Sequence, residues 1–268
     1  MYRDAFVNYR WALLHVFIKK YPFSVILREN DKHINISSPL EAYLYSRGLS
    51  DVVIDDGKDT VIFRFGNRQL RFVGAVKNGD LGASFGEYRH LPVKDRIVVD
   101  IGASIGDTSI YFALIGGAKK IIALEPIQVS YELARKNIDL NECRDKIELV
   151  NAGCCGVNKT IFIERSLKPI SSTVLKEAFN GIPVKLLTLR DIIELYGIDS
   201  AVLKIDCEGC EYETILMSDC ETLRKFDQIQ IEFHDGARRL VKKLRSCGFQ
   251  VHYSLGKAIG YIYAVRLD

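Results

Sequence analysis

From Arg96 onward the chain alternates short, continuously apolar runs with longer segments of helical period, and this alternation limits the possible folds more than any other feature. Runs that are apolar at successive positions are typical of strands buried on both faces. Such runs occupy residues 97–102, 119–126, 146–153, 201–209 and 227–234. Because helical segments separate the runs, the pattern predicts an α/β protein with a doubly wound, mostly parallel sheet.

The last part of the chain departs from this alternation. Two extended runs, 251–255 and 260–267, follow each other without a helix between them, and glycines bound the segment that separates them. This arrangement predicts a closing hairpin that adds one antiparallel strand near the edge and brings the sheet to seven strands. Residues 160–164 and 183–189 are further extended runs.

The region before the core runs is organised differently. One amphipathic helical segment lies near the N-terminus, and His15 interrupts its apolar part, which is unlike a secretory signal. Short alternating runs separated by turn residues follow, and they predict a small antiparallel sheet. We therefore expect two domains: residues 1–90, a helix-plus-strand module that is a candidate for substrate binding or a lid, and residues 91–268, the core.

Composition excludes several classes of protein. A formal charge of +3 over 268 residues is too small for a dedicated nucleic-acid binder. No apolar run approaches the ~20 residues of a membrane span, so we expect no membrane partner.

The seven cysteines stand mostly in apolar segments, which predicts reduced thiols in a cytoplasmic protein. Cys207 and Cys210 form a C-x-x-C pair, but no second pair completes a zinc site, so we predict no metal. A redox pair is an alternative, although such a pair normally opens a helix after a strand in a smaller fold.

The first core run ends in a loop that suits a ligand. Residues 98–109 read VVDIGASIGDTS, an apolar strand that breaks into small residues. Gly102 and Gly106 permit positive φ or a close approach of the backbone to a ligand. Thr108 opens the following helix, whose N-terminus favours an electronegative group. Because ligands of open α/β sheets bind at the carboxyl ends of strands, this loop is the natural place for one.

Two further strand ends carry polar groups. The second run ends in Glu125 and Pro126, and a carboxylate there can accept two hydrogen bonds from a ribose diol. The third run ends in Asn151 and Ala152, a polar group beside a small one that suits the edge of an adenine ring. With the first loop, these residues predict an adenosine-containing ligand without identifying it.

Three motifs resemble those of the FkbM family of S-adenosylmethionine-dependent methyltransferases. DIGASIG at 100–106 resembles the family's D-x-G-A-N-x-G, with Ser104 in the place of asparagine. LKIDCEGCEYE at 203–213 resembles K-x-D-x-E-G-x-E, and IEFH at 231–234 is the third match.

Weaker matches support the same family at residues 149–152, 171–172 and 188–193. Arg190 stands where the family commonly has an acid. The resemblance extends from about Phe85 to the end of the chain, and the N-terminal module is its least matched part. It implies a class I methyltransferase fold, which is Rossmann-like.

The resemblance also implies S-adenosyl-L-methionine as cofactor, bound around the first motif. Asp100 and the backbone at Gly102 would face its methionine part, Glu125 would hold the ribose hydroxyls, and Asn151 or Ala152 would lie near the adenine. The expected cofactor-binding residues are Asp100, Gly102, Ala103, Ser104, Gly106, Thr108, Glu125, Pro126, Asn151, Ala152 and Asp206.

The later motifs contain the expected catalytic residues. Asp206 and Glu208 project to one side if the strand stays extended, and Glu232 and His234 share a side at the end of the next strand. We expect these four groups to converge over the cofactor's methyl group. Asp206, Glu208 and His234 are the predicted catalytic residues, with His234 suited to act as a base.

Structural roles are the alternatives for the same residues. Asp206 could cap the helix that begins near Gly209, and Glu211 fits an acid in the first turn of that helix. Metal binding by Asp206, Glu208 and His234, as in some catechol methyltransferases, is not supported by their spacing alone.

The leading functional hypothesis is O-methylation of a small-molecule or sugar-like hydroxyl. RNA methylation is an alternative in which the N-terminal module binds RNA through basic residues, although a solvated face is the preferred interpretation of those residues. They are Arg64, Arg68, Arg71 and Lys77. A non-catalytic module that keeps the cofactor pocket is a further alternative. A nicotinamide oxidoreductase fits less well, because the loop lacks the middle glycine of that fingerprint.

A short segment before the first core strand is either a lid over the methionine end or a surface linker. Its candidate residues are Phe85, Glu87, Tyr88 and His90.

Overall fold

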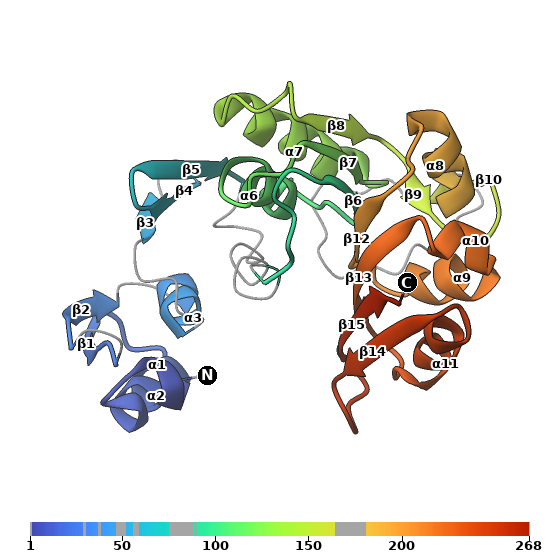
Figure 1. Ribbon diagram of the computed structural model, residues 1–268. Coiled ribbons are helices and arrows are strands. Elements are labelled where there is room, and N and C mark those ends of the chain that lie inside the picture. Colours follow the sequence, from blue (N-terminus) through green and yellow to red (C-terminus); the bar gives the residue numbers. More distant parts are fainter. Residues whose placement is uncertain are drawn as a thin grey trace. The chain divides into compact units, whose positions relative to one another are not determined.

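Figure 1 shows the computed structural model of the chain, which describes residues 2–28, 31–36, 39–46, 52–55, 59–74, 88, 90–163 and 181–267. The chain divides into two compact units, Met1–Leu91 and Pro92–Asp268. The matches at 171–172, the lid candidates Phe85 and Glu87, and Lys77 of the basic set lie outside the described residues.

A seven-stranded sheet forms the centre of the second unit. Its strands follow the order β14-β15-β13-β12-β6-β7-β8. Their bounds are β6 Ile97–Ile101, β7 Lys120–Leu124, β8 Ile147–Val150, β12 Ala201–Ile205, β13 Phe226–Phe233, β14 Phe249–Tyr253 and β15 Gly260–Arg266. Neighbouring strands are parallel except where β15 pairs with β13 and with β14. The predicted seven-stranded, mostly parallel sheet with one antiparallel strand is confirmed.

The central strands are buried on both faces, which is why they read as continuous apolar runs. Every residue of β12 is buried, and so are the last four residues of β6 and of β7. The strand order reverses beside β6, because the chain runs from β6 to β7 and β8 on one side and returns to β12 on the other. Ligands of open α/β sheets bind at the carboxyl ends of strands beside such a reversal.

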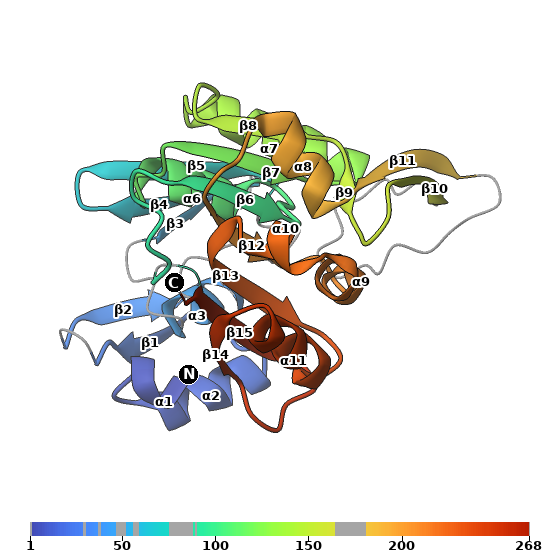
Figure 2. The same cartoon turned by 45° about the vertical axis from the view of Figure 1, so that its right-hand side comes forward.

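Helices cover both faces of this sheet. Their bounds are α6 Asp107–Leu114, α7 Gln128–Leu140, α8 Leu189–Tyr196, α9 Cys210–Met217, α10 Cys220–Leu223 and α11 Arg238–Ser246. The last four contribute to one apolar core with Val99 and Ile101 of β6, and α9 packs beside α11 (Figures 1 and 2). Ser109 of α6 contacts Asp100, which points to the opposite face because side chains alternate along a strand.

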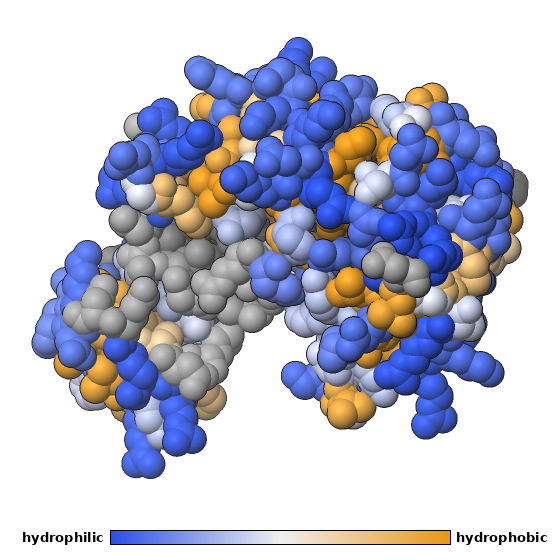
Figure 3. Space-filling model, in the orientation of Figure 1, coloured by the Kyte–Doolittle hydropathy of each residue, from blue (hydrophilic) through white to orange (hydrophobic). Residues whose placement is uncertain are grey.

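Helix α7 has one buried face and one exposed face. Its buried residues are Ser130, Ala134, Asn137 and Ile138, which recur at helical spacing and face the sheet. The surface seen above α7 and β8, at the top of Figure 3, is mostly hydrophilic.

A smaller sheet lies beside the main one. It consists of β9 Gly153–Cys154, β10 Lys159–Ile163 and β11 Ile182–Leu187. β10 pairs antiparallel with β11, and β11 pairs parallel with β9. In Figure 2 the β10–β11 pair projects away from the seven-stranded sheet. The two further extended runs predicted from the sequence are therefore strands.

The first unit contains more elements than its sequence pattern predicts. Its helices are α1 Tyr2–Ala5, α2 Tyr9–Phe17 and α3 Pro39–Ser46, and its strands are β1 Phe23–Ile26, β2 His33–Ile36, β3 Val52–Asp55, β4 Thr60–Phe65 and β5 Arg68–Val73. The prediction of one helical segment and one small sheet is wrong in two respects. The strands form two separate antiparallel sheets, β1-β2 and β3-β4-β5, and α3 lies between them in the chain. α3 has only eight residues and little amphipathic pattern, so tertiary packing decides its conformation.

Two of the basic residues of the RNA hypothesis share a face of this unit. Arg64 is on β4 and Arg71 on β5. Their exposed side chains share the face of the β4–β5 hairpin opposite the buried Phe63 and Phe72. Of the remaining lid candidates, Tyr88 is buried and His90 is exposed.

The cysteine prediction is wrong. Cys207 is bonded to Cys210, and Cys220 is bonded to Cys247, while Cys143, Cys154 and Cys155 are free and buried. Cys220 begins α10 and Cys247 follows α11, so their proximity depends on helix packing, which sequence spacing does not contain. The cytoplasmic location, which was inferred from reduced thiols, loses that support. In the described part of the chain, no helix is both long and apolar enough to cross a bilayer.

Candidate functional site

Most of the predicted site residues lie at the carboxyl ends of four neighbouring strands. The first loop follows β6, Glu125 follows β7, Asp206 follows β12, and His234 follows β13. These strands adjoin one another in the order β13-β12-β6-β7, on both sides of the reversal in strand order. The topology therefore gathers residues that are up to 134 positions apart along the chain (100 to 234) at one edge of the sheet.

The loop after β6 requires an unusual backbone. Gly102, Ser104 and Gly106 all have positive φ, of +79°, +48° and +84°. A Cβ at Gly102 would lie 1.8 Å from the carbonyl oxygen of Asp206, so only glycine lets this loop touch the end of β12. Ser104 adopts a conformation that asparagine tolerates better than serine, which explains why asparagine suits this position of the motif.

Asp100 is paired within the protein. Its carboxylate is fully buried, forms an ion pair with the Lys204 ammonium at 2.9 Å and accepts a 2.6 Å hydrogen bond from the Ser109 hydroxyl. Asp100 and Lys204 are register partners on the adjacent strands β6 and β12. Lys204 also donates to the Gly102 carbonyl at 2.8 Å. Asp100 and Lys204 thus support the loop after β6 through the Gly102 carbonyl, and the expected contact of Asp100 with the methionine part stays a prediction.

Burial and charge act in opposite directions on Lys204. Burial, the largest single effect, disfavours its ammonium, but the attractions of Asp100, Asp206 and Asp107 and the hydrogen bond with Asp100 together outweigh it, and the pKa of Lys204 is raised. The Lys204 side chain therefore stays charged at neutral pH.

Glu125 is a buried carboxylate held by two backbone N–H groups. One oxygen accepts a hydrogen bond from the Ser104 backbone N–H and the other from the Ile127 N–H, both at 2.8 Å. Burial raises its pKa to about 7, against the effect of these two hydrogen bonds. Each carboxylate oxygen keeps a second lone pair, so the group can still accept from two hydroxyls.

The strand end after β8 shapes the neighbouring turn. The exposed Asn151 donates its side-chain amide to the carbonyls of Glu125 and Pro126, at 3.0 and 3.4 Å, and Ala152 is buried. Of the other expected cofactor-binding residues, Ala103, Gly106 and Thr108 are buried. Those left partly accessible are Gly102, Ser104, Pro126 and Asp206.

The structure brings the four acidic and histidine groups at the carboxyl ends of β12 and β13 together. Asp206, Glu232 and His234 each have one polar atom within 4.8 Å of the others. The Nε2 atom of His234 lies 3.3 Å from a carboxylate oxygen of Glu208. Glu208 reaches this position from a left-handed backbone, with φ of +55°, so the expected extended conformation is wrong. Gly209, not Asp206, occupies the N-cap position of α9, which contradicts the alternative role of Asp206 as a cap.

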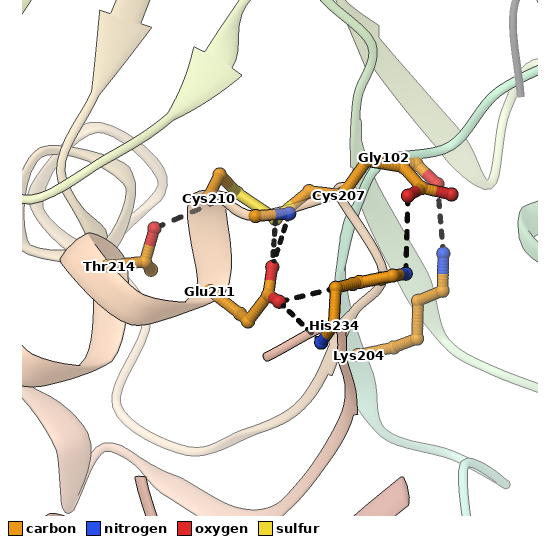
Figure 4. Close-up of a disulfide and its surroundings, with 9 residues drawn as sticks. Gly102, Lys204, Cys207, Cys210, Glu211, Thr214 and His234 are labelled. Atoms are coloured by element: carbon orange, nitrogen blue, oxygen red, sulfur yellow. Dashed lines mark hydrogen bonds and ion pairs between the residues drawn. A yellow bond between two sulfur atoms is a disulfide. The ribbon is translucent and has the colours of Figure 1, made fainter. Parts of the chain in front are cut away.

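Glu211 lies in the first turn of α9, as expected from the sequence, but it also contacts His234. Its carboxylate is fully buried, and one oxygen accepts from the Gly209 N–H at 2.8 Å. The other oxygen lies 3.1 Å from both the backbone N and the Nδ1 of His234. Figure 4 shows Glu211 between the disulfide and His234. Its place as the last acid of K-x-D-x-E-G-x-E was the only sequence signal for this role.

These contacts shift the titration of His234. The hydrogen bond that His234 donates to Glu211 raises the pKa of His234 to about 9; burial opposes this shift, and the nearby Glu208 reinforces it. A pKa of about 9 favours the protonated ring at neutral pH, which argues against a histidine base; the role of His234 as a base stays a prediction.

Comparison with known proteins identifies relatives of the second unit. The family model described as "Methyltransferase FkbM domain" matches residues 100–251. "Methyltransferase sdnD" from Sordaria araneosa is 27% identical over 151 residues, which cover 44% of this chain and 58% of the relative. A "Ribosomal protein L11 methyltransferase" from Carboxydothermus hydrogenoformans is 37% identical over 83 residues, which cover 31% of this chain and 26% of the relative. The aligned segments thus span less than two thirds of these curated relatives.

Solved structures show remote likeness in fold. The chain matches "Methyltransferase FkbM" from Methylobacillus flagellatus at 14% identity and a TM-score of 0.47, over 63% of this chain and 43% of the other. A protein in the NADB-Rossmann superfamily from Streptococcus agalactiae matches at 14% identity and a TM-score of 0.45, over 72% of this chain and 73% of the other.

Arg190 stands at the position where the family motif commonly has an acid. In this structure Arg190 pairs with Asp219 at the start of α10.

Proposed function

The chain belongs to the FkbM methyltransferase family, whose model matches more than half of it, and we propose that it transfers a methyl group from S-adenosylmethionine to a hydroxyl of a small or sugar-like molecule. The observation that carries the proposal is the contact of Gly102 with the carbonyl of Asp206. This contact joins the loop proposed to hold the donor to the acids proposed to hold the acceptor.

The residues at the ends of β6 and β7 fit an adenosine-containing cofactor. Glu125 is a buried carboxylate with free lone pairs and a raised pKa, which suits a ribose diol that donates two hydrogen bonds. The backbone at Gly102 and Ser104 is partly accessible beside it, and Asn151 holds the turn that follows Glu125. S-adenosylmethionine, when bound, supplies a methyl group already activated by its sulfonium. The chain's own task is to align the acceptor and exclude water.

A carboxylate is the proposed base on the acceptor side. Burial raises the pKa of Glu208, which brings this group closer to the range in which a base works at neutral pH. The protonated His234 contacts Glu208 and holds it in place, and Glu211 in turn holds His234. We propose that Glu208 takes the proton from the acceptor hydroxyl, that Asp206 orients that hydroxyl, and that His234 is a positioning residue.

Titration with S-adenosylhomocysteine tests the donor site. A folded sample is expected to release or absorb heat on binding, and Glu125→Ala is expected to weaken binding by about tenfold to a hundredfold, because a charge-assisted hydrogen bond is lost. Glu148→Ala removes an exposed acid from β8 and is the matched control. A flat trace from a folded sample would refute the proposal.

The acceptor is tested by following S-adenosylhomocysteine formation over a panel of sugar and phenolic hydroxyl compounds, with transfer RNA included. Glu208→Gln is expected to lower kcat by about a hundredfold or more while leaving the affinity for S-adenosylhomocysteine unchanged. Turnover with transfer RNA alone, and none with hydroxyl compounds, would favour the RNA hypothesis instead.

A further inference from the structure

The Cys207–Cys210 disulfide closes a four-residue ring within the proposed acceptor site. The ring begins directly after Asp206 at the end of β12 and ends at the first residue of α9. Its two inner residues, Glu208 and Gly209, have φ of +55° and +110°. Glu208 is not glycine, so its left-handed backbone is unfavourable and needs a constraint that maintains it. The disulfide is a covalent constraint on this residue.

The ring is coupled to His234 by two contacts. Glu208, inside the ring, contacts Nε2 of the imidazole at 3.3 Å. Glu211, just after the ring, accepts from the Gly209 N–H at 2.8 Å and lies 3.1 Å from Nδ1 of His234. Figure 4 shows this chain of contacts from the disulfide through Glu211 to His234. A change in the ring therefore acts on both sides of the imidazole.

The surroundings of the two sulfurs differ in a way that favours thiol chemistry. Both cysteines are half-buried, so the bond is open to small reagents. Cys210 is the first residue of α9, and the Thr214 hydroxyl donates to its sulfur at 3.8 Å. Cys207 lies 3.7 Å from the buried Glu211 carboxylate, which disfavours a second negative charge. Cys210 is therefore the better-stabilised thiolate and the better leaving group.

We propose that Cys207–Cys210 is a reversible thiol–disulfide site whose closed form holds Glu208 and Glu211 against His234. The reductant is a dithiol. One of its thiolates bonds to the Cys207 sulfur as the Cys207–Cys210 bond breaks, and the electron pair leaves on Cys210. The second thiolate then attacks the dithiol's own bound sulfur, which releases Cys207 as a thiolate that takes up a proton and leaves the dithiol as a cyclic disulfide.

Opening the ring frees Glu208 to leave its left-handed conformation and weakens its contact with His234. The consequence for methyl transfer, a slower reaction in the reduced protein, rests on the proposed function. The thiol chemistry and the effect on His234 do not depend on that function, and both are measured without any methyl donor.

The first experiment titrates the full-length protein with mixtures of reduced and oxidised dithiothreitol and maps free thiols by alkylation and peptide mass spectrometry. Cys207 and Cys210 are expected to become alkylated at less reducing mixtures than Cys220 and Cys247, while circular dichroism stays unchanged. The second disulfide is the internal control, because Cys247 is buried. Opening of Cys207–Cys210 only together with loss of the circular dichroism signal would overturn the proposal, since the bond would then be purely structural.

The second experiment follows the His234 imidazole by NMR as a function of pH, with the signal assigned from a His234→Asn variant. Reduction with dithiothreitol is expected to lower the pKa of His234 by about half a unit or more, because a carboxylate that moves away from the ring no longer stabilises its charge. The carboxylates around the ring are Asp206, Glu208, Glu211 and Glu232. Cys207→Ser/Cys210→Ser is expected to show the lower pKa without reductant, and Cys220→Ser/Cys247→Ser is the matched control. An unchanged pKa in the reduced wild-type protein would overturn the coupling. Titration with S-adenosylhomocysteine on the same samples tests the proposed donor site separately.

Discussion

Ser104 is a residue whose backbone conformation is unfavourable for its side chain. Its φ of +48° lies in the left-handed region, which costs a non-glycine residue roughly 1 kcal/mol. Ser104→Gly relieves this cost and is therefore expected to raise the free energy of unfolding by about 0.5–1 kcal/mol. The conformational entropy that glycine adds to the unfolded chain reduces this gain. Urea denaturation measures the change. Ser246→Gly, at the helical end of α11, is the control and is expected to lower stability. Equal destabilisation by both substitutions would contradict the argument.

Glu125 links cofactor binding to pH. Its pKa of about 7 lies above the ordinary value of 4.5, and a ribose diol that donates to the carboxylate stabilises the ionised form. Binding then releases a proton, so affinity for S-adenosylhomocysteine is expected to rise about tenfold between about pH 6 and pH 8. Calorimetry in buffers of different ionisation enthalpy measures this release. Glu125→Gln should abolish the pH dependence; its persistence in that variant would assign the proton to another group.

Glu125 and His234 both make the folded protein less stable as pH rises, but over different pH ranges. For Glu125 the folded protein holds the proton more tightly than the unfolded chain, so the free energy of unfolding falls as pH rises from 4.5 to about 7. For His234 the folded pKa of about 9 exceeds the ordinary 6.5, so its stabilising contribution is complete below 6.5 and is lost as pH rises through 9.

At the scale of secondary-structure elements, two disulfides differ in what they connect. Cys220–Cys247 joins α10 to the end of α11 across a separation of 27 residues, whereas Cys207–Cys210 spans 3. Because the longer loop restricts the unfolded chain more, Cys220→Ser/Cys247→Ser is expected to lower the free energy of unfolding by about 3–4 kcal/mol, against about 2 for Cys207→Ser/Cys210→Ser. Urea denaturation of the two variants gives the comparison. The opposite order would show that the loop-entropy argument does not describe this protein.

The elements themselves were predictable where their pattern is local. β6, β7 and β12 were predicted because strands buried on both faces are apolar at nearly every position. α8 is also locally encoded, since Thr188 and Asp191 form a capping box and Gly197 ends the helix with positive φ. By contrast, α3 and the division of the N-terminal strands into two sheets depend on packing, and their short segments carry little pattern of their own.

At the scale of the whole molecule, every residue proposed to contact the cofactor belongs to the second compact unit. We propose that this unit binds the cofactor by itself. A fragment of residues 92–268 is expected to bind S-adenosylhomocysteine as tightly as the full chain, measured by calorimetry after circular dichroism has established that the fragment is folded. A loss of about tenfold or more in the folded fragment would assign part of the cofactor site to the first unit.

The sequence by itself determined the order of strands and helices in the core, the glycine loop after the first strand and the acids at the strand ends. Each of these depends on local periodicity or on backbone sterics at single residues. Only the tertiary structure decided which groups meet: Asp100 with Lys204, Glu211 with His234, and Cys220 with Cys247. These partners are 104, 23 and 27 positions apart, and their contact follows from strand register and helix packing. Those contacts hold the Asp100 carboxylate in a buried ion pair and raise the pKa of His234, because a buried side chain responds to its neighbours in space rather than to its neighbours in the chain.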